Sequence, residues 1–402
     1  MRPMPRLRLS LFYGAFFLAW GAVLPYWPVW YAERGLSPET IGLAGGVGLC
    51  ARMLISPLAA FWSDGLRRAK DPLIALCWLT LAFWIAHIPV REPWMLVTLA
   101  FLTGAALYPV IPLSDSLAVR EARRGGFAFG PIRAIGSSAF IVANLACGAL
   151  ISVFGGEAML AWMIGSTLLL AMMALLLPAG TRADAPEPAV ARLRDLGRLA
   201  SRPDFILALL ASGLIAGSHA FYYGFSAIAW RDQGTPAIWV GVLWGVAVAG
   251  EIVFFAVSAR LPGQLSPVLL MAAGAVAAIV RWLALAASPP LPVLLALQIL
   301  HGFSFGATFL GFVIYTERVA GEGRAASVFA LNSAIAGGAF AAILTVISGW
   351  LYASFGAWAF AAMAIPAALG GVCALALGGV RQPAPQSQPH SAGDGIPIDA
   401  PL

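Results

Sequence analysis

Long runs of apolar residues fill most of this 402-residue chain and leave few charged residues between them. An α-helix needs about 20 apolar residues to cross a hydrocarbon core about 30 Å thick. Hydrophobic residues make up 60% of the chain and charged residues only 10%, whereas soluble domains carry roughly 25% charged residues. The chain is therefore predicted to be an all-α membrane protein.

The apolar runs predict twelve transmembrane helices in two six-helix bundles, residues 1–178 and 204–380. The segment 179–203, rich in proline, alanine and arginine, is the predicted cytoplasmic linker between them. The tail 381–402 has few large apolar residues and is predicted to be disordered. The predicted spans are 9–31, 39–63, 71–90, 93–120, 127–153, 157–178, 204–230, 236–260, 265–287, 290–317, 324–352 and 356–380.

Basic residues are distributed unevenly between the two sides of these spans. Of the 24 lysines and arginines, 18 fall on one side, 3 on the other and 3 inside the spans. Because basic loops stay in the cytoplasm, both termini are predicted to be cytoplasmic in a multi-pass protein of the bacterial inner membrane. The net charge of +6 thus reflects topology, and no nucleic-acid partner is expected.

A weak internal repeat supports two related halves. Glycines seven residues apart flank a proline in Gly35–Gly42, at the second span, and in Gly234–Gly241, at the eighth. Ten residues after the second glycine stands Arg52 in one half and Glu251 in the other. Matched positions that carry opposite charges fit the parallel repeats of major facilitator transporters.

Seven ionisable residues fall well inside the predicted spans, where a charge costs about 2.5–3.5 kcal/mol on insertion scales. Such residues face the bundle interior, either as a functional site or as ion pairs that join two helices. They are Arg52, Asp115, Arg133, His219, Glu251, Arg281 and His301.

Helix geometry places two pairs of these residues at matching depths. Asp115 and Arg133 both stand about 12–15 Å from the turn between their spans, so they are candidates for an ion pair. Arg281 and His301 reach similar depths on either side of the turn at residues 289–290. Both pairs are predicted to face the interior.

Each remaining buried group has a functional and a structural interpretation. Glu251 is the sole carboxylate deep in the second half; it is a candidate proton carrier or the partner of a salt bridge to Arg281. The histidines titrate near neutrality or are hydrogen-bonded core residues. Arg52 is a substrate ligand or a counter-ion for a buried carboxylate. Further polar or aromatic candidates, each equally compatible with helix packing, are Trp20, Tyr26, Tyr222, Tyr223, Gln298 and Asn332.

Several stretches resemble one family of transporters. Phe129–Phe140 (FGPIRAIGSSAF) resembles the fifth-helix signature of the phenylpropionate permease group of the major facilitator superfamily, and of lactose-permease-like proton symporters. His219–Ile228, Pro25–Trp30 and Leu297–His301 are similar to further segments of that group. The resemblance spans nearly the whole chain except the linker and tail.

The resemblance implies proton-coupled uptake by alternating access, with residues in named roles. Asp115 and Arg133 occupy the positions that hold the substrate in the lactose permease pattern. Candidate substrate ligands beside them are Arg52, Tyr222 and His219. The proton-coupling positions of the pattern correspond to Glu251, Arg281 and His301.

Two features depart from the family pattern. Lactose permease has a proton-carrying glutamate one turn after the histidine, where this chain has Ser304, so Glu251 becomes the better candidate carrier. The signature between the second and third spans is degenerate, but Asp64 with Arg67 and Arg68 is predicted to form a cytoplasmic gate contact, with plain topogenic charge as the alternative.

The leading hypothesis is a proton-coupled symporter for a small organic solute, with an aromatic carboxylate such as a phenylpropionate favoured. Arginine offers bidentate binding to a carboxylate. The alternatives are a nucleoside or sugar proton symporter, and a non-transporting membrane sensor that keeps the fold. No phosphate loop, placed nucleophile or metal-ligand spacing indicates an enzyme, a metal site or a cofactor. The expected partners are the solute, protons and the lipid bilayer, and the chain is expected to act as a monomer.

Overall fold

The computed structural model describes residues 5–64, 66–180, 197, 201–260, 265–320, 328, 331–333 and 335–380. Within these ranges every regular element is a helix, which confirms the all-α prediction. The tail 381–402 lies outside the described residues, as does the predicted linker except for residues 179, 180, 197 and 201–203.

Ten helical stretches of the described chain are long and apolar enough to cross a membrane. One of them, Leu331–Gly379, is 49 residues long, or about 74 Å at 1.5 Å per residue, which is enough for two crossings. The predicted third span forms a helix of 17 residues. The count of twelve spans stays a prediction.

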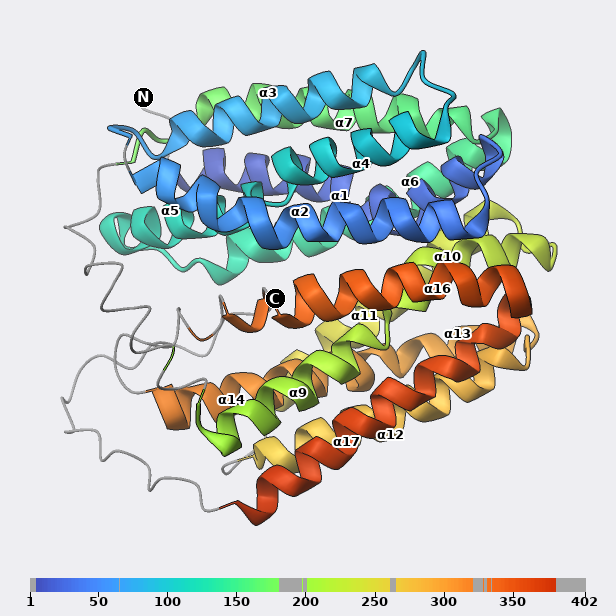
Figure 1. Cartoon of the computed structure of the whole chain (residues 1–402). Coiled ribbons are helices and arrows are strands. Elements are labelled where there is room, and N and C mark those ends of the chain that lie inside the picture. Colours follow the sequence, from blue (N-terminus) through green and yellow to red (C-terminus); the bar gives the residue numbers. More distant parts are fainter. Residues whose placement is uncertain are drawn as a thin grey trace.

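The N-terminal bundle packs seven helices together in the upper part of Figure 1. Proline stands in the first turn of several of them, where its missing N–H costs nothing. The helices are α1 (Pro5–Glu33), α2 (Pro38–Asp64), α3 (Lys70–Ala86), α4 (Pro93–Leu107), α5 (Val110–Gly125), α6 (Gly130–Phe154) and α7 (Glu157–Leu176).

The C-terminal bundle forms the lower part of the same view. It contains α9 (Pro203–Gly217), α10 (Ala220–Asp232), α11 (Ala237–Ser258), α12 (Pro267–Ala286), α13 (Leu291–Ile299), the π-helical η1 (Gly302–Ala307), α14 (Thr308–Ala320), the π-helical η2 (Ile335–Phe340), α16 (Ala341–Phe355), the 3₁₀ turn η3 (Gly356–Met363) and α17 (Ala364–Gly379).

Several predicted spans are interrupted, and two of the interruptions have local causes that the contacts show. Span 93–120 divides between α4 and α5 at Pro109, which has no N–H to donate and whose ring crowds the preceding turn. Span 204–230 divides between α9 and α10, where the side chains of Ser218 and His219 both bond the carbonyl of Ile215 and compete with the helical ladder. Both breaks place polar or aromatic side chains at mid-span.

The two most extensive helix contacts between the halves are α2 against α16 and α11 against α6, and α1 also packs against α10. The helices α2 and α11 are the ones that begin at the repeated glycine motif. Gly42 of α2 lies against the backbone of Gly349, and Gly241 of α11 lies against the carbonyl of Asn144. The repeat therefore marks the helices that cross between the bundles.

Candidate functional site

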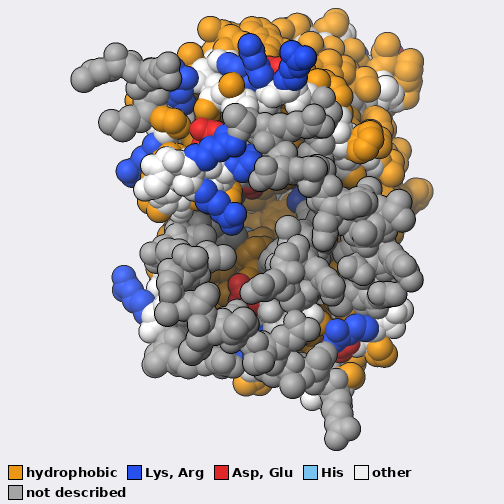
Figure 2. All heavy atoms as spheres, turned by 90° about the vertical axis from the view of Figure 1, so that its left-hand side faces the viewer, with side chains coloured by type: hydrophobic (Ala, Val, Ile, Leu, Met, Phe, Trp, Pro, Cys, Tyr) orange, Lys and Arg blue, Asp and Glu red, His pale blue; other side chains and the backbone are white. Residues whose placement is uncertain are grey.

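A hollow opens between the two bundles on the face that carries the arginine-rich loops (Figure 2). At the opposite face the bundles contact each other. Arg231 Nη1 lies 2.5 Å from Glu33 Oε1, and the Tyr26 hydroxyl donates to the carbonyls of Asn144 and Ala237, each at 3.0 Å. The hollow is thus closed off by paired side chains at the far end of the bundles.

Asp115 and Arg133 lie in the N-terminal bundle, each partly exposed. They interact electrostatically, as expected from their matching depths. They form no direct ion pair among the described residues, because the Tyr13 hydroxyl donates to the Asp115 carboxylate and the Arg133 guanidinium lies 4.3 Å from the centre of the Phe17 ring. Asp115 and Arg133 are therefore neighbours without the predicted direct ion pair.

The Arg133 guanidinium has no hydrogen-bond acceptor in the described part of the chain, and its position over Phe17 fixes its orientation. Glu251 of α11, in the other bundle, is near enough for its charge to act on Arg133, although no direct contact joins the two side chains among the described residues. Five N–H donors in a planar fork suit a carboxylate. Arg133 is thus a guanidinium whose chemistry suits an anionic ligand.

A chain of contacts runs through the C-terminal bundle. Arg281 Nη2 donates to Gln298 Oε1 at 2.7 Å, and Arg281 Nη1 lies 3.0 Å from His301 Nδ1. His301 Nε2 stands 3.7 Å from Glu251 Oε2. The predicted common depth of Arg281 and His301 is confirmed by their direct contact.

The order of these groups excludes one structural alternative. Glu251 and Arg281 form no direct ion pair among the described residues, since His301 stands between them. A guanidinium only donates, so His301 Nδ1 must accept, and its proton must be on Nε2, which faces Glu251. The suggested salt bridge from Glu251 to Arg281 is thus not formed among the described residues, where the His301 ring lies between the two side chains.

His219 and Tyr222 are fully buried within the same bundle. His219 Nε2 lies 3.0 Å from the Ser304 hydroxyl, and Tyr222 donates to Gln298 Oε1 at 3.1 Å. Ser304, at the position where lactose permease has its glutamate, thus supports a histidine. His219 and Tyr222, the two predicted substrate ligands, are thus covered by other side chains in this structure. Their role in binding substrate stays a prediction.

Arg52 extends from α2 to the other bundle. Its Nη2 donates to the Ser333 hydroxyl at 2.9 Å, and its guanidinium lies 5.9 Å from the centre of the Tyr108 ring. Its bonded partner is a serine, so the alternative of a counter-ion for Glu251 or Asp115 is not what the structure shows. Arg52 remains a candidate ligand at the interface of the bundles.

The predicted gate residues lie on the arginine-rich face. Arg67 and Arg68 are exposed in the connection between α2 and α3. Asp64 ends α2, and its side chain lies outside the described residues. The gate contact stays a prediction. No group of three metal-ligating side chains occurs among the residues that the structure describes.

Sequence reasoning missed Tyr13 and Phe17, which position Asp115 and Arg133. A signal for them exists, because Tyr13, Phe17 and Trp20 follow one another at the helical spacing of four and three residues on α1. Such a stripe places aromatic rings on one helix face, but the sequence alone does not show which helix the face contacts.

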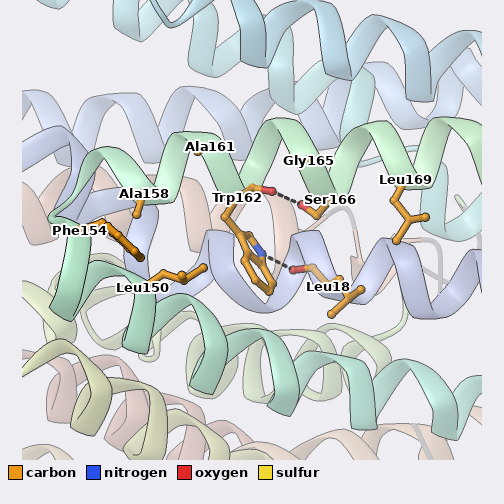
Figure 3. A pocket seen from close by; sticks show the side chains of 9 residues that line it. All are labelled: Leu18, Leu150, Phe154, Ala158, Ala161, Trp162, Gly165, Ser166 and Leu169. Atoms are coloured by element: carbon orange, nitrogen blue, oxygen red, sulfur yellow. Dashed lines mark hydrogen bonds between the residues drawn. The ribbon is translucent and has the colours of Figure 1, made fainter.

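An apolar recess of about 600 Å³ lies elsewhere, between α1, α6 and α7 (Figure 3). Its side chains include Phe154, which is 71% exposed on the outer surface of the bundle. Trp162 donates to the carbonyl of Leu18 at 2.9 Å, and Ser166 donates to the carbonyl of Trp162 at 2.7 Å. No charged residue lines this recess, and none of the charged candidate residues is among its lining residues. It is therefore not the candidate transport site.

Comparison with known proteins gives consistent relatives. The model of the MFS_1 like family matches residues 6–362. A probable 3-phenylpropionic acid transporter of Escherichia coli (strain K12) is 34% identical over 375 residues, which cover 89% of this chain and 95% of that protein. The maltose permease of Geobacillus stearothermophilus is 30% identical over 343 residues, covering 85% and 86%.

Solved structures show the same fold at lower identity. The nucleoside transporter NupG aligns with a TM-score of 0.79 and 17% identity over 94% of this chain and 99% of that one. A bacterial homologue of the human lysosomal transporter Spinster aligns with a TM-score of 0.72 and 15% identity over 95% and 99%.

Proposed function

This chain belongs to the MFS_1 like family of major facilitator transporters, and we propose that it imports a small organic carboxylate together with a proton by alternating access. Transporters of this family are not enzymes. We place the chain in the bacterial inner membrane with both termini in the cytoplasm, so the hollow of Figure 2 opens inward.

The orientation of Arg133 carries this proposal. Its guanidinium is held over Phe17 with no acceptor among the described residues, while the Asp115 carboxylate is bonded to Tyr13. Charged side chains deep in the described spans also leave one positive charge in excess. They are the arginines 52, 133 and 281 and the carboxylates Asp115 and Glu251. A site of net positive charge attracts a monoanion.

The relatives support the choice of an aromatic acid within this class. The name of the 34%-identical relative is that of a 3-phenylpropionic acid transporter. Because the other relative, at 30% identity, is named a maltose permease, a sugar is the alternative substrate for this chain. A ring with a carboxylate side chain fits a guanidinium beside aromatic residues better than a polyhydroxylated solute does.

Proton coupling follows from competition for Arg133. Ionised Glu251 and a substrate carboxylate are both attracted to the same guanidinium. A proton that binds the Glu251 carboxylate removes one competitor, and the substrate then holds Arg133 alone. His301, with its Nε2 3.7 Å from Glu251, is positioned to stabilise the ionised form after the proton leaves.

The test is uptake of labelled 3-phenylpropanoate into proteoliposomes under an imposed pH gradient. Unlabelled aromatic acids, sugars and nucleosides serve as competitors. Arg133→Gln removes a charge-assisted hydrogen bond, which corresponds to a loss of roughly 10- to 150-fold in affinity. The matched control is Arg260→Gln, because Arg260 is exposed at the end of α11. Full uptake by Arg133→Gln refutes the site, and competition by sugars alone selects the alternative substrate.

A further inference from the structure

We propose that Trp20 and Tyr108 form the subsite that binds the ring of an aromatic substrate, while Arg133 binds its carboxylate. This inference rests on the carboxylate transport proposed above and adds the residues that select the apolar part of the substrate.

A row of aromatic rings connects the two arginines of the N-terminal bundle. The rings of Phe16 and Trp20 stack with centres 5.9 Å apart, and Trp20 meets Tyr108 edge to face at 5.5 Å. Arg133 lies over Phe17 at one end of the row, and Arg52 lies over Tyr108 at the other. Phe17 contacts Phe16 at 5.1 Å, so the row is continuous.

Trp20 and Tyr108 are partly exposed, whereas Phe16 and Phe17 are buried. The exposed side of Trp20 faces away from the lipid. Leu18 lines the outer recess against α7, and Trp20 follows two residues later, about 200° around the helix. Trp20 therefore points toward the space between the bundles, where Arg52 of the same row bonds Ser333 of the opposite bundle.

The spacing along α1 indicates the shape of the ligand. Phe17 and Trp20 are three residues apart, so their side chains lie about 5–6 Å from each other on one helix face. A carboxylate bound to Arg133 beside Phe17 reaches a ring beside Trp20 only through a short flexible spacer. An acid with a two-carbon spacer satisfies both contacts, whereas an acid whose carboxylate is attached directly to the ring does not.

The ring contact is aromatic in character and not merely apolar. Edge-to-face and stacked ring pairs gain about 0.5–1.5 kcal/mol beyond the burial of area. That range corresponds to a preference of roughly two- to twelvefold for a phenyl ring over a saturated ring of similar size.

The experiment is calorimetric binding to the purified full chain with 3-phenylpropanoate, 3-cyclohexylpropanoate and benzoate. Native protein is expected to prefer the phenyl acid over the cyclohexyl acid by two- to twelvefold and to bind benzoate most weakly. Trp20→Leu should remove the phenyl preference, and Trp20→Phe should restore most of it. Trp78→Leu is the matched control, since Trp78 is 39% exposed on the outer surface of α3.

Equal affinity of native protein for the phenyl and cyclohexyl acids would overturn the subsite, even if Trp20→Leu failed to fold. Retention of the preference in folded Trp20→Leu would overturn it as well. Unchanged binding of every acid by Arg133→Gln would instead overturn the carboxylate site, so the two failures are distinguishable.

Discussion

A methyl group at Gly42 should shift the protein out of the state described here. Gly42 of α2 lies against Gly349 of α16, and a Cβ added there would stand 2.8 Å from the Gly349 Cα and 2.9 Å from its nitrogen. Both neighbouring atoms belong to the backbone and cannot rotate away. The clash exists only while the two bundles touch at this face, so Gly42→Ala should penalise this state alone.

The expected size of the shift follows from the cost of overpacking. An extra methyl group in a close-packed contact costs about 1–3 kcal/mol. The two conformations compared are the one described here and the one that opens at the face of Glu33 and Arg231. The cost changes their ratio about 5- to 150-fold toward the second. The helix itself should tolerate alanine well, because alanine has the higher helix propensity.

The assay is a spin-label distance measurement across the closed face. Labels at Glu92→Cys and Ala287→Cys, both exposed on loops of different bundles, report the separation there. The four native cysteines are first replaced. Gly165→Ala is the control, because a Cβ at Gly165 meets nothing within 4 Å. A distance distribution in Gly42→Ala identical to that of the control would refute the reasoning.

Three further outcomes follow from the contacts described. Glu251→Gln should retain exchange of labelled substrate across the membrane but lose accumulation driven by a pH gradient, because the side chain is permanently neutral; accumulation at the native level would contradict the coupling role. Gln298→Leu removes one of the two acceptors of the buried Arg281 guanidinium and should destabilise the protein by about 1–3 kcal/mol, measured by thermal unfolding in detergent. Glu33→Gln weakens the ion pair with Arg231, whose side chains are 36% and 33% exposed, so the balance between conformations should change by only about fivefold or less in the same distance measurement.

The sequence was sufficient to predict the membrane fold, since apolar length and basic asymmetry are local properties of the chain. The break at Pro109 could also have been predicted, because proline disrupts a helix by its own covalent structure. The break at His219 could not, because it depends on side chains that choose a backbone carbonyl over the helical ladder.

Pairings at the candidate site were only partly predictable. Depth along two adjacent antiparallel helices correctly placed Arg281 beside His301. The same reasoning placed Asp115 near Arg133 but missed Tyr13. This residue comes from a third helix, and its hydroxyl, not Arg133, donates to the Asp115 carboxylate. A single sequence indicates how deep each polar residue lies in the membrane. Which residues at the same depth touch depends on which helices are neighbours, and one sequence does not show that.

The single excess positive charge among the deep arginines and carboxylates persists through the symport cycle proposed above, in which one proton accompanies each monoanion, and this has an electrical consequence. One monoanion that enters with one proton leaves the charge of the site unchanged, so a complete one-to-one cycle moves no net charge across the bilayer. Each elementary charge that crosses is worth about 2.3 kcal/mol per 100 mV, and here that contribution cancels. Accumulation should therefore follow the pH difference and be indifferent to the membrane voltage.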